Sequence, residues 1–304
     1  MQERVEDRAK PAASAGDGKA HIAAKVGTTG HEWDGISELN TPLPRWWLWL
    51  FYATIIWAIG YWIVYPAWPL ISSYSNGAFN WHSRSSVAAD LAALQTQRAP
   101  MMDKLAAASL QDIETKPELL DFARALGSRA FADNCAPCHG AGGGGAKGYP
   151  NLTDDDWLWG GKLADISQTI THGVRSTDDQ GHQGSMPAFG RDGMLKRDDI
   201  VAVANYVHSL SGLSTTPGVD LARGTKVFAD NCAVCHGPDG KGNRSLGSAN
   251  LTDKIWLYGS DTKDIVDGIW NGHGGVMPAW GGKLDPVTIK ALTVYVHTFG
   301  GGEK

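Results

Sequence analysis

The chain has four cysteines, and they form two pairs with the same spacing, each followed directly by a histidine. The two segments read FADNCAPCHG at 131–140 and FADNCAVCHG at 228–237. C-x-x-C-H is the sequence pattern of c-type haem attachment, in which both cysteines form thioethers to the haem and the histidine is the proximal iron ligand. The pattern therefore predicts two covalently bound haems. The attachment residues are Cys135, Cys138, Cys232 and Cys235, and the proximal ligands are His139 and His236.

A methionine in a repeated loop is the candidate for the second axial ligand of each iron. Met186 and Met277 both stand in the pattern M-P-A-aromatic-G, which the proline stiffens. A thioether ligand raises the reduction potential of a haem and suits an electron-transfer site. We therefore predict His/Met ligation for both irons. The spacing permits each repeat to be self-contained, but facing domains could exchange their methionine loops.

Other chemistry for these residues fits the sequence less well. A lone C-x-x-C also occurs in dithiol redox sites, which need a βαβ pattern, and in zinc sites, which need two further ligands nearby. A lone methionine is usually core filling. The two motifs occur twice and in the same order, which favours haem. His182 and His273 stand four residues before the methionines and are alternative candidates for the iron ligands, but we interpret them as loop residues or partners of haem propionates. We interpret His208 and His297, in the terminal helices, as structural.

The residues around these motifs repeat as well. NLTDDDWLWG at 151–160 matches NLTDKIWLYG at 250–259, and NYVHSL at 205–210 matches VYVHTF at 294–299. The order is kept throughout, which indicates a tandem duplication of one helical domain. We expect two domains of the class I cytochrome c fold, at 117–213 and 214–304. Their terminal helical runs should cover Arg197–Leu210 and Pro286–Phe299.

One uncharged segment is long enough to cross a bilayer. Trp46–Tyr65 contains 20 residues without a charge, and aromatic residues crowd both of its ends. Prolines flank the segment on both sides. A signal peptide would begin nearer Met1 and would be shorter. We therefore predict an all-α chain with one transmembrane helix.

The distribution of basic residues predicts the orientation of this helix. Six lysines and arginines precede it, whereas Arg84 is the only one between the helix and residue 97. Attachment of c-type haem takes place outside the cytoplasm, which agrees with a cytoplasmic N-terminus. The expected order is a disordered cytoplasmic tail (1–30), a cytoplasmic lead-in and transmembrane helix (31–70), a partly helical periplasmic connector (71–116) and the two haem domains.

The net charge and its distribution along the chain do not favour nucleic-acid binding. The formal charge is -5, and acidic and basic residues are mixed along the chain. Without a basic stripe, the sequence does not indicate nucleic-acid binding.

The lead-in and the span resemble a known family. HEWDGISELNTPLPRWW at 31–47 and YPAWP at 65–69, together with two C-x-x-C-H domains, are similar to the dihaem subunit III of cbb₃-type cytochrome c oxidases, the FixP or CcoP family. The resemblance implies a bacterial inner-membrane protein in a proton-pumping oxidase. It further implies two haem c groups that relay electrons from a soluble or membrane-bound cytochrome c donor to the monohaem and catalytic subunits. By position it implies haem attachment at the four cysteines and ligation by His139, Met186, His236 and Met277.

Two other functions compete with this interpretation. A membrane-tethered dihaem carrier serving another respiratory complex would need only an apolar anchor, not the HEWDGI and YPAWP sequences. A dihaem peroxidase needs an iron with an open or displaceable position, which two matching methionine loops do not favour. The chain is not expected to be an enzyme by itself, because one span cannot build a membrane-embedded oxygen-reducing site.

Overall fold

The structure, a computed structural model, describes residues 26–303. The chain forms two compact units, one extending through Ala93 and the other beginning at Leu94, and each is described separately. Most of the tail expected at 1–30 lies outside the described residues. Its last three residues do not follow the expectation of disorder, because a strand begins at Thr28.

The described part of the first unit begins with a small hairpin, which departs from the expectation of an all-α chain. Strand β1 (Thr28–Trp33) pairs antiparallel with β2 (Ile36–Leu39), and Trp33 is opposite Ile36. Asp34 and Gly35 form the turn, with φ values of 52° and 79°. Asp-Gly is favoured in such two-residue turns because both positions need positive φ.

Helix α2 (Arg45–Val64) confirms the predicted apolar helix to within one residue at each end. It contains no buried residue, although its sequence is strongly apolar. Among the described residues, it is the one helix long and apolar enough to cross a membrane. Its exposed apolar surface is explained if lipid is its solvent.

The connector is more helical than expected. Helix α3 (Ser83–Ala107) begins in the first unit and ends in the second, and α4 (Leu110–Thr115) follows it. The Ser109 side chain accepts a hydrogen bond from the Asp112 amide at 3.1 Å, which caps α4. Leu105 and Ile113 are fully buried, so this end of the connector belongs to the core of the second unit.

The second unit contains the same helices in each repeat, in the same order. The first repeat provides α5 (Pro117–Asn134), α6 (Ala136–His139), α7 (Leu163–His172) and α8 (Arg197–Leu210). The second provides α9 (Leu221–Asn231), α10 (Ala233–His236), α11 (Thr262–Asn271) and α12 (Pro286–His297). The predicted terminal helices are both present, and the predicted helical fold class is confirmed.

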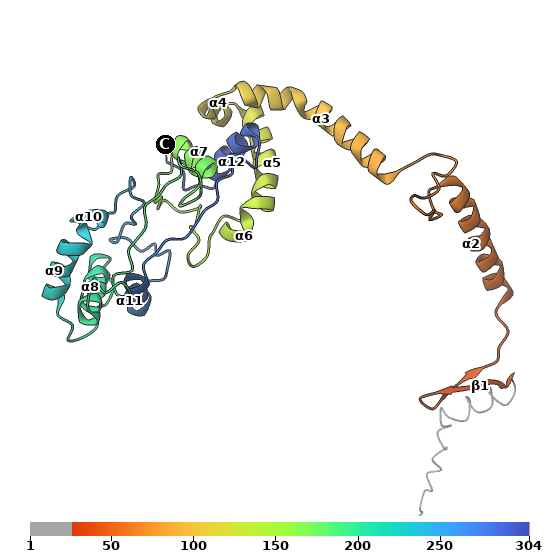
Figure 1. Ribbon diagram of the computed structural model, residues 1–304, viewed down its shortest axis with the longest axis horizontal. Coiled ribbons are helices and arrows are strands. Elements are labelled where there is room, and N and C mark those ends of the chain that lie inside the picture. The colour runs from red at the N-terminus through yellow and green to blue at the C-terminus, as the bar shows by residue number, and fades with distance from the viewer. Residues whose placement is uncertain (1–25, 304) are drawn as a thin grey trace, which may run out of the picture. The chain divides into compact units, whose positions relative to one another are not determined.

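The terminal helices are exchanged between the repeats. Helix α12 packs on α5 and α7 of the first repeat, whereas α8 packs on α9 and α11 of the second (Figure 1). We call the first lobe α5, α6, α7, the Met277 loop and α12. We call the second lobe α9, α10, α11, the Met186 loop and α8. The domain boundaries 117–213 and 214–304 stay a prediction, because they describe the two repeats in the sequence. Each lobe in the structure combines helices from the two repeats.

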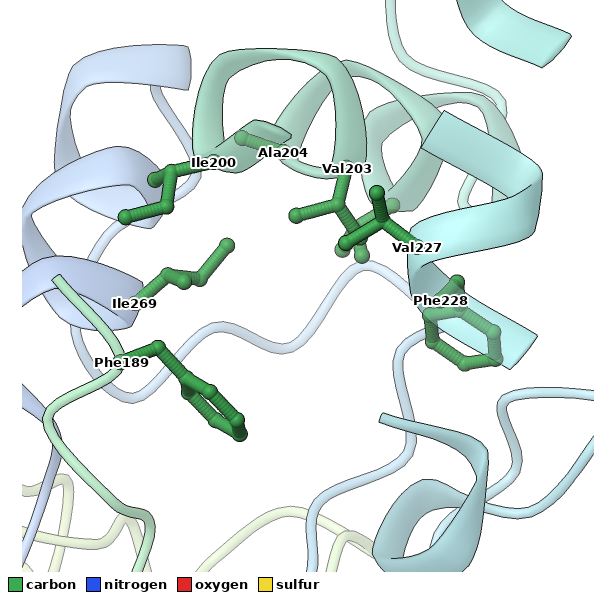
Figure 2. Close-up of a cluster of buried hydrophobic side chains, with 8 residues drawn as sticks. Phe189, Ile200, Val203, Ala204, Val227, Phe228 and Ile269 are labelled. Atoms are coloured by element: carbon green, nitrogen blue, oxygen red, sulfur yellow. The ribbon is translucent and has the colours of Figure 1, made fainter. Parts of the chain in front are cut away.

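Each lobe has its own hydrophobic core. The core of the first lobe consists of Phe131, Ile166, Ile170, Ile289, Leu292 and Val296. The core of the second consists of Phe189, Ile200, Val203, Ala204, Val207, Val227, Phe228 and Ile269. In Figure 2, Phe189 and Ile269 lie on one side of the second core, Val227 and Phe228 lie on the other, and α8 carries Ile200 and Val203 above them.

Candidate haem sites

Each C-x-x-C-H motif forms one tight helical turn directly after a longer helix. In the first lobe, the amides of Cys138 and His139 donate to the Cys135 carbonyl at 3.1 and 2.9 Å. In the second lobe, Cys235 and His236 donate to the Cys232 carbonyl at the same distances. This turn places two cysteines and a histidine side by side, as covalent attachment and proximal ligation require.

Both proximal histidines are oriented by a backbone carbonyl. Nδ1 of His139 lies 2.9 Å from the Pro150 carbonyl oxygen, and Nδ1 of His236 lies 2.9 Å from that of Ala249. A carbonyl can only accept, so Nδ1 carries the proton and Nε2 keeps its lone pair. Such a second hydrogen bond fixes the ring and makes the free nitrogen a better metal ligand. Burial also lowers the pKa of His236, which favours its neutral form.

One cysteine of each pair has a pKa shifted in the direction opposite to that of a redox nucleophile. All four are free in the structure. Burial, with a smaller contribution from the neighbouring cysteine, raises the pKa of Cys135 and of Cys232 to about 11. A reactive dithiol needs a lowered pKa, because the thiolate is its nucleophile. In the described part of the chain, no group of three or more His, Cys, Asp or Glu side chains is arranged to hold a metal ion.

Each methionine loop joins the lobe of the other repeat. Met186 packs against the second core, as Cys232 does, and Met277 packs against the first core, as Cys135 does. Of the two arrangements that the spacing left open, the structure therefore has the exchanged one.

Backbone pairing holds each loop in place. The amides and carbonyls of Met277 and Val174 are hydrogen-bonded to each other, with both distances 3.0 Å. Met186 and His273 pair in the same way, at 2.9 and 3.2 Å. The strand-like contact follows a glycine at the end of a helix, Gly173 after α7 and Gly272 after α11, with φ of 74° and 71°. A positive φ at these positions lets the chain turn from the helix directly towards the methionine loop.

An aromatic ring stacks on each histidine that precedes a methionine loop, His182 and His273. These two aromatic residues were not among the site residues predicted from the sequence. Trp159 stacks on His182 with ring centroids 4.2 Å apart, and Tyr258 stacks on His273 at 3.6 Å. Burial lowers the pKa of both histidines, which favours their neutral form. The two aromatics occupy matching positions in NLTDDDWLWG and NLTDKIWLYG, and that repetition was the available signal.

The histidines expected to be structural are hydrogen-bonded at the ends of their helices. His208 contacts the Ser214 and Ser260 carbonyls at 2.9 and 2.5 Å. His297 contacts Glu114 at 2.6 Å and the Glu303 carbonyl at 3.0 Å. Both imidazoles therefore use both ring nitrogens within the protein.

Comparison with known proteins identifies the family. The N-terminal domain of cytochrome oxidase-cbb3, FixP, matches residues 25–72, cytochrome c matches 124–211, and cytochrome c oxidase, cbb3-type, subunit III matches 219–296. A cbb3-type cytochrome c oxidase subunit FixP from Azorhizobium caulinodans is 66% identical over 91% of this chain and 94% of its own length. The chain belongs to the FixP/CcoP family. FixP from Bradyrhizobium diazoefficiens is 63% identical and CcoP from Cereibacter sphaeroides 48%, each over 91% of this chain and 95% of its own length.

Membership of this family confirms the predicted fold of two cytochrome c domains and the prediction of two haem c cofactors. The side chains of both lobes fit such a group. Trp157 and Trp256 occupy matching positions and pack against the first and second cores respectively. Trp157 donates its indole N–H to the Gly301 carbonyl at 2.6 Å. The N–H of Trp256 is buried without a partner, and a buried donor of this kind needs an acceptor, which a haem propionate would provide.

Proposed function

We propose that this chain is the electron-transfer subunit of a cbb₃-type oxidase. It accepts electrons from a cytochrome c donor and passes them through its two haems to the monohaem and catalytic subunits, which reduce oxygen to water and pump protons. The observation that carries the proposal is the pair of lobes, each combining C-x-x-C-H with a methionine loop, joined to the N-terminal segment that matches FixP. The chain is not an enzyme by itself.

The residues proposed to hold the haems follow from the exchanged packing. In the first lobe, Cys135 and Cys138 would form the thioethers, and His139 and Met277 would hold the iron. In the second lobe, the corresponding residues are Cys232, Cys235, His236 and Met186. The bound haem irons supply reversible one-electron chemistry at a potential that the thioether ligand raises. The protein orients the imidazoles through Pro150 and Ala249 and presents the sulfurs on paired backbone.

The proposed orientation places the N-terminus in the cytoplasm of a bacterial inner membrane and both lobes in the periplasm. Arg45 begins α2, and the other basic residues of the N-terminal segment precede it in the sequence. The excess of Lys and Arg on this side supports the assignment. A periplasmic position would also expose the lobes to a soluble or membrane-anchored cytochrome c donor.

The competing function is a dihaem carrier that serves another respiratory complex. Two observations favour the oxidase: the match to the FixP N-terminal domain, and a folded hairpin ahead of the span. A simple tether has no need of either feature. Since lipid is as apolar as the side chains of α2, association with other helices must come from shape and polar contacts, which a generic anchor would lack.

A chimaera tests the proposal. Residues 31–69 are replaced by an unrelated single span of the same orientation, and the chain is purified from membranes with its two haems. We expect membrane attachment and haem content to be retained, but co-purification with the oxidase core and oxygen consumption driven by cytochrome c to be lost. Normal assembly and respiration by the chimaera would show that the segment is only a tether and would contradict the proposal.

A further inference from the structure

The uncharged part of the first unit extends well beyond α2. No Asp, Glu, Lys or Arg occurs from Trp46 to Ser83, and Arg84 is the first charged residue after the span. Helix α2 has 20 residues, which at 1.5 Å per residue cover about 30 Å, the thickness of the hydrocarbon core. The uncharged chain that follows therefore lies outside that core. We call residues 66–81 the collar.

The collar folds back onto the C-terminal end of α2. The amides of Ala78 and Phe79 donate to the carbonyls of Ile63 and Val64 at 2.9 and 3.1 Å. These carbonyls belong to the last turn of the helix, where no intrahelical donor is available. The collar thus supplies donors to two carbonyls of the helix end, which lowers the cost of placing that end in contact with lipid.

The collar also pairs much of its own backbone. Within it, the Leu70 amide donates to the Ser73 carbonyl at 2.7 Å, and the Ser75 amide to the Trp68 carbonyl at 2.9 Å. The Ser75 hydroxyl accepts from the amides of Ala67 and Trp68 at 3.4 and 3.1 Å. A loop in water can leave such groups to the solvent, whereas a loop in a region of low polarity cannot.

The side chains of the collar are nevertheless apolar and exposed. Its large exposed side chains are Trp68, Leu70, Ile71, Tyr74, Phe79 and Trp81. Ile71 is fully exposed and stands at the turn between Leu70 and Ser73. Two rings of the collar contact the helix end edge to face: Trp68 contacts Trp62 with ring centroids 5.0 Å apart, and Phe79 contacts Tyr65 at 5.8 Å. This composition is that of an aromatic belt, in which Trp and Tyr lie at the level of the lipid headgroups.

We propose that the collar is a lipid-binding element, which lies in the headgroup region of the leaflet at the C-terminal end of α2 with Leu70 and Ile71 inserted among the acyl chains. Its continuity with the span places the collar at this depth. Its partly paired backbone lowers the cost of a region of low polarity, and its lack of charge removes the main cost of entry. Serine and asparagine side chains between the apolar residues suit the headgroup layer. The occupant of the apolar surface is thus lipid and not another subunit.

Site-directed spin labelling of the full haem-loaded chain tests this inference. All four native cysteines serve haem attachment, so Ile71→Cys adds a single reactive thiol at a position where the side chain has no packing role. The labelled chain is placed in phosphatidylcholine–phosphatidylglycerol vesicles, and power saturation is measured with oxygen, which concentrates in lipid, and with a water-soluble nickel chelate. Each is measured against a nitrogen baseline, so that relaxation caused by haem iron cancels.

The matched control is Ala222→Cys, an exposed position on α9 in the second unit. We expect the ratio of oxygen to nickel accessibility at position 71 to exceed that at position 222 several-fold, both in the isolated chain and in the assembled oxidase. Equal ratios would place the collar in water and overturn the inference. Exclusion of both reagents, in either preparation, would mean that protein covers the collar, and would also overturn it. Leu70→Cys, at the same turn, provides a second measurement of the accessibility ratio.

Discussion

Gly127 in α5 lies directly against the backbone of Ala291 in α12. A Cβ at Gly127 would be 2.6 Å from the Ala291 carbonyl oxygen and 2.6 Å from Cβ of Tyr295. The second lobe repeats the contact, because Gly224 in α9 faces Ala202 and Tyr206 of α8 in the same way. In both lobes a glycine of one repeat is paired with the terminal helix of the other. The two repeats are therefore coupled, since neither lobe is complete without a helix from its neighbour.

Gly127→Ala tests this coupling. The added methyl has no flexible side chain to displace and meets backbone, so the helices must separate. We expect a loss of about 1–3 kcal/mol in the free energy of unfolding, the usual cost of overpacking. Thermal unfolding of the full haem-loaded chain, followed by circular dichroism and haem absorption, measures it. Gly282→Ala, where nothing lies within 4 Å of the new Cβ, should have no comparable effect.

The second prediction assigns the methionines. In a background that keeps only the first-lobe haem, through Cys232→Ala and Cys235→Ala, Met277→His should lower the midpoint potential. The expected shift is on the order of 0.1 V, part of the roughly 0.8 V range that axial ligands cover. Met186→His in the same background should leave the potential unchanged. The opposite result would mean that each repeat supplies its own ligand, despite the packing of Met277 on the first core. Redox titration of the haem absorption gives both values.

The third prediction concerns the two matching tryptophans. Trp256→Phe should lower the potential of the second-lobe haem, because it removes a buried donor that would partly neutralise a propionate of the bound haem. Trp157→Phe should leave the potential of the first-lobe haem nearly unchanged, since that indole is already bonded to Gly301, and should instead cost about 1 kcal/mol of stability. Redox titration and unfolding of both variants separate the effects. Equal potential shifts in the two would show that the tryptophans have the same role.

The sequence predicted the elements of this protein better than their assembly. Helix α8 was predicted at its observed ends, and α2 to within a residue, because periodicity and charge are local properties. The exchange of α8 and α12 was not predictable, because each helix carries an apolar face that suits either lobe. The spacing of Met186 and Met277 likewise allowed both arrangements. The hairpin turn at Asp34-Gly35 has a local signal that was available but not used.

A cavity of about 550 Å³ lies beside a group of carboxylates contributed by both repeats, Asp155, Asp156 and Asp253. Burial, helped by the charges of Asp253 and Asp154, raises the pKa of Asp156 to about 6. The Arg244 guanidinium opposes this effect, but it is also paired with Glu303. At neutral pH the Asp156 carboxylate is charged, and this charge lowers the free energy of unfolding of the chain.

The fourth prediction follows from this raised pKa. Between pH 4 and 6 the folded chain keeps a proton on Asp156 that the unfolded chain has lost, so the group lowers stability as pH rises through this window and by a constant amount above it. Asp156→Asn removes the titration. We expect the variant to gain stability relative to the unmodified chain from pH 4 to 6, reaching about 1 kcal/mol at pH 7 after screening by solvent is allowed for. Thermal unfolding across this range measures the difference, in which the titration of other groups cancels. A difference for Asp156→Asn that is flat, or that falls with pH, would show that its carboxylate is not destabilised in the folded chain.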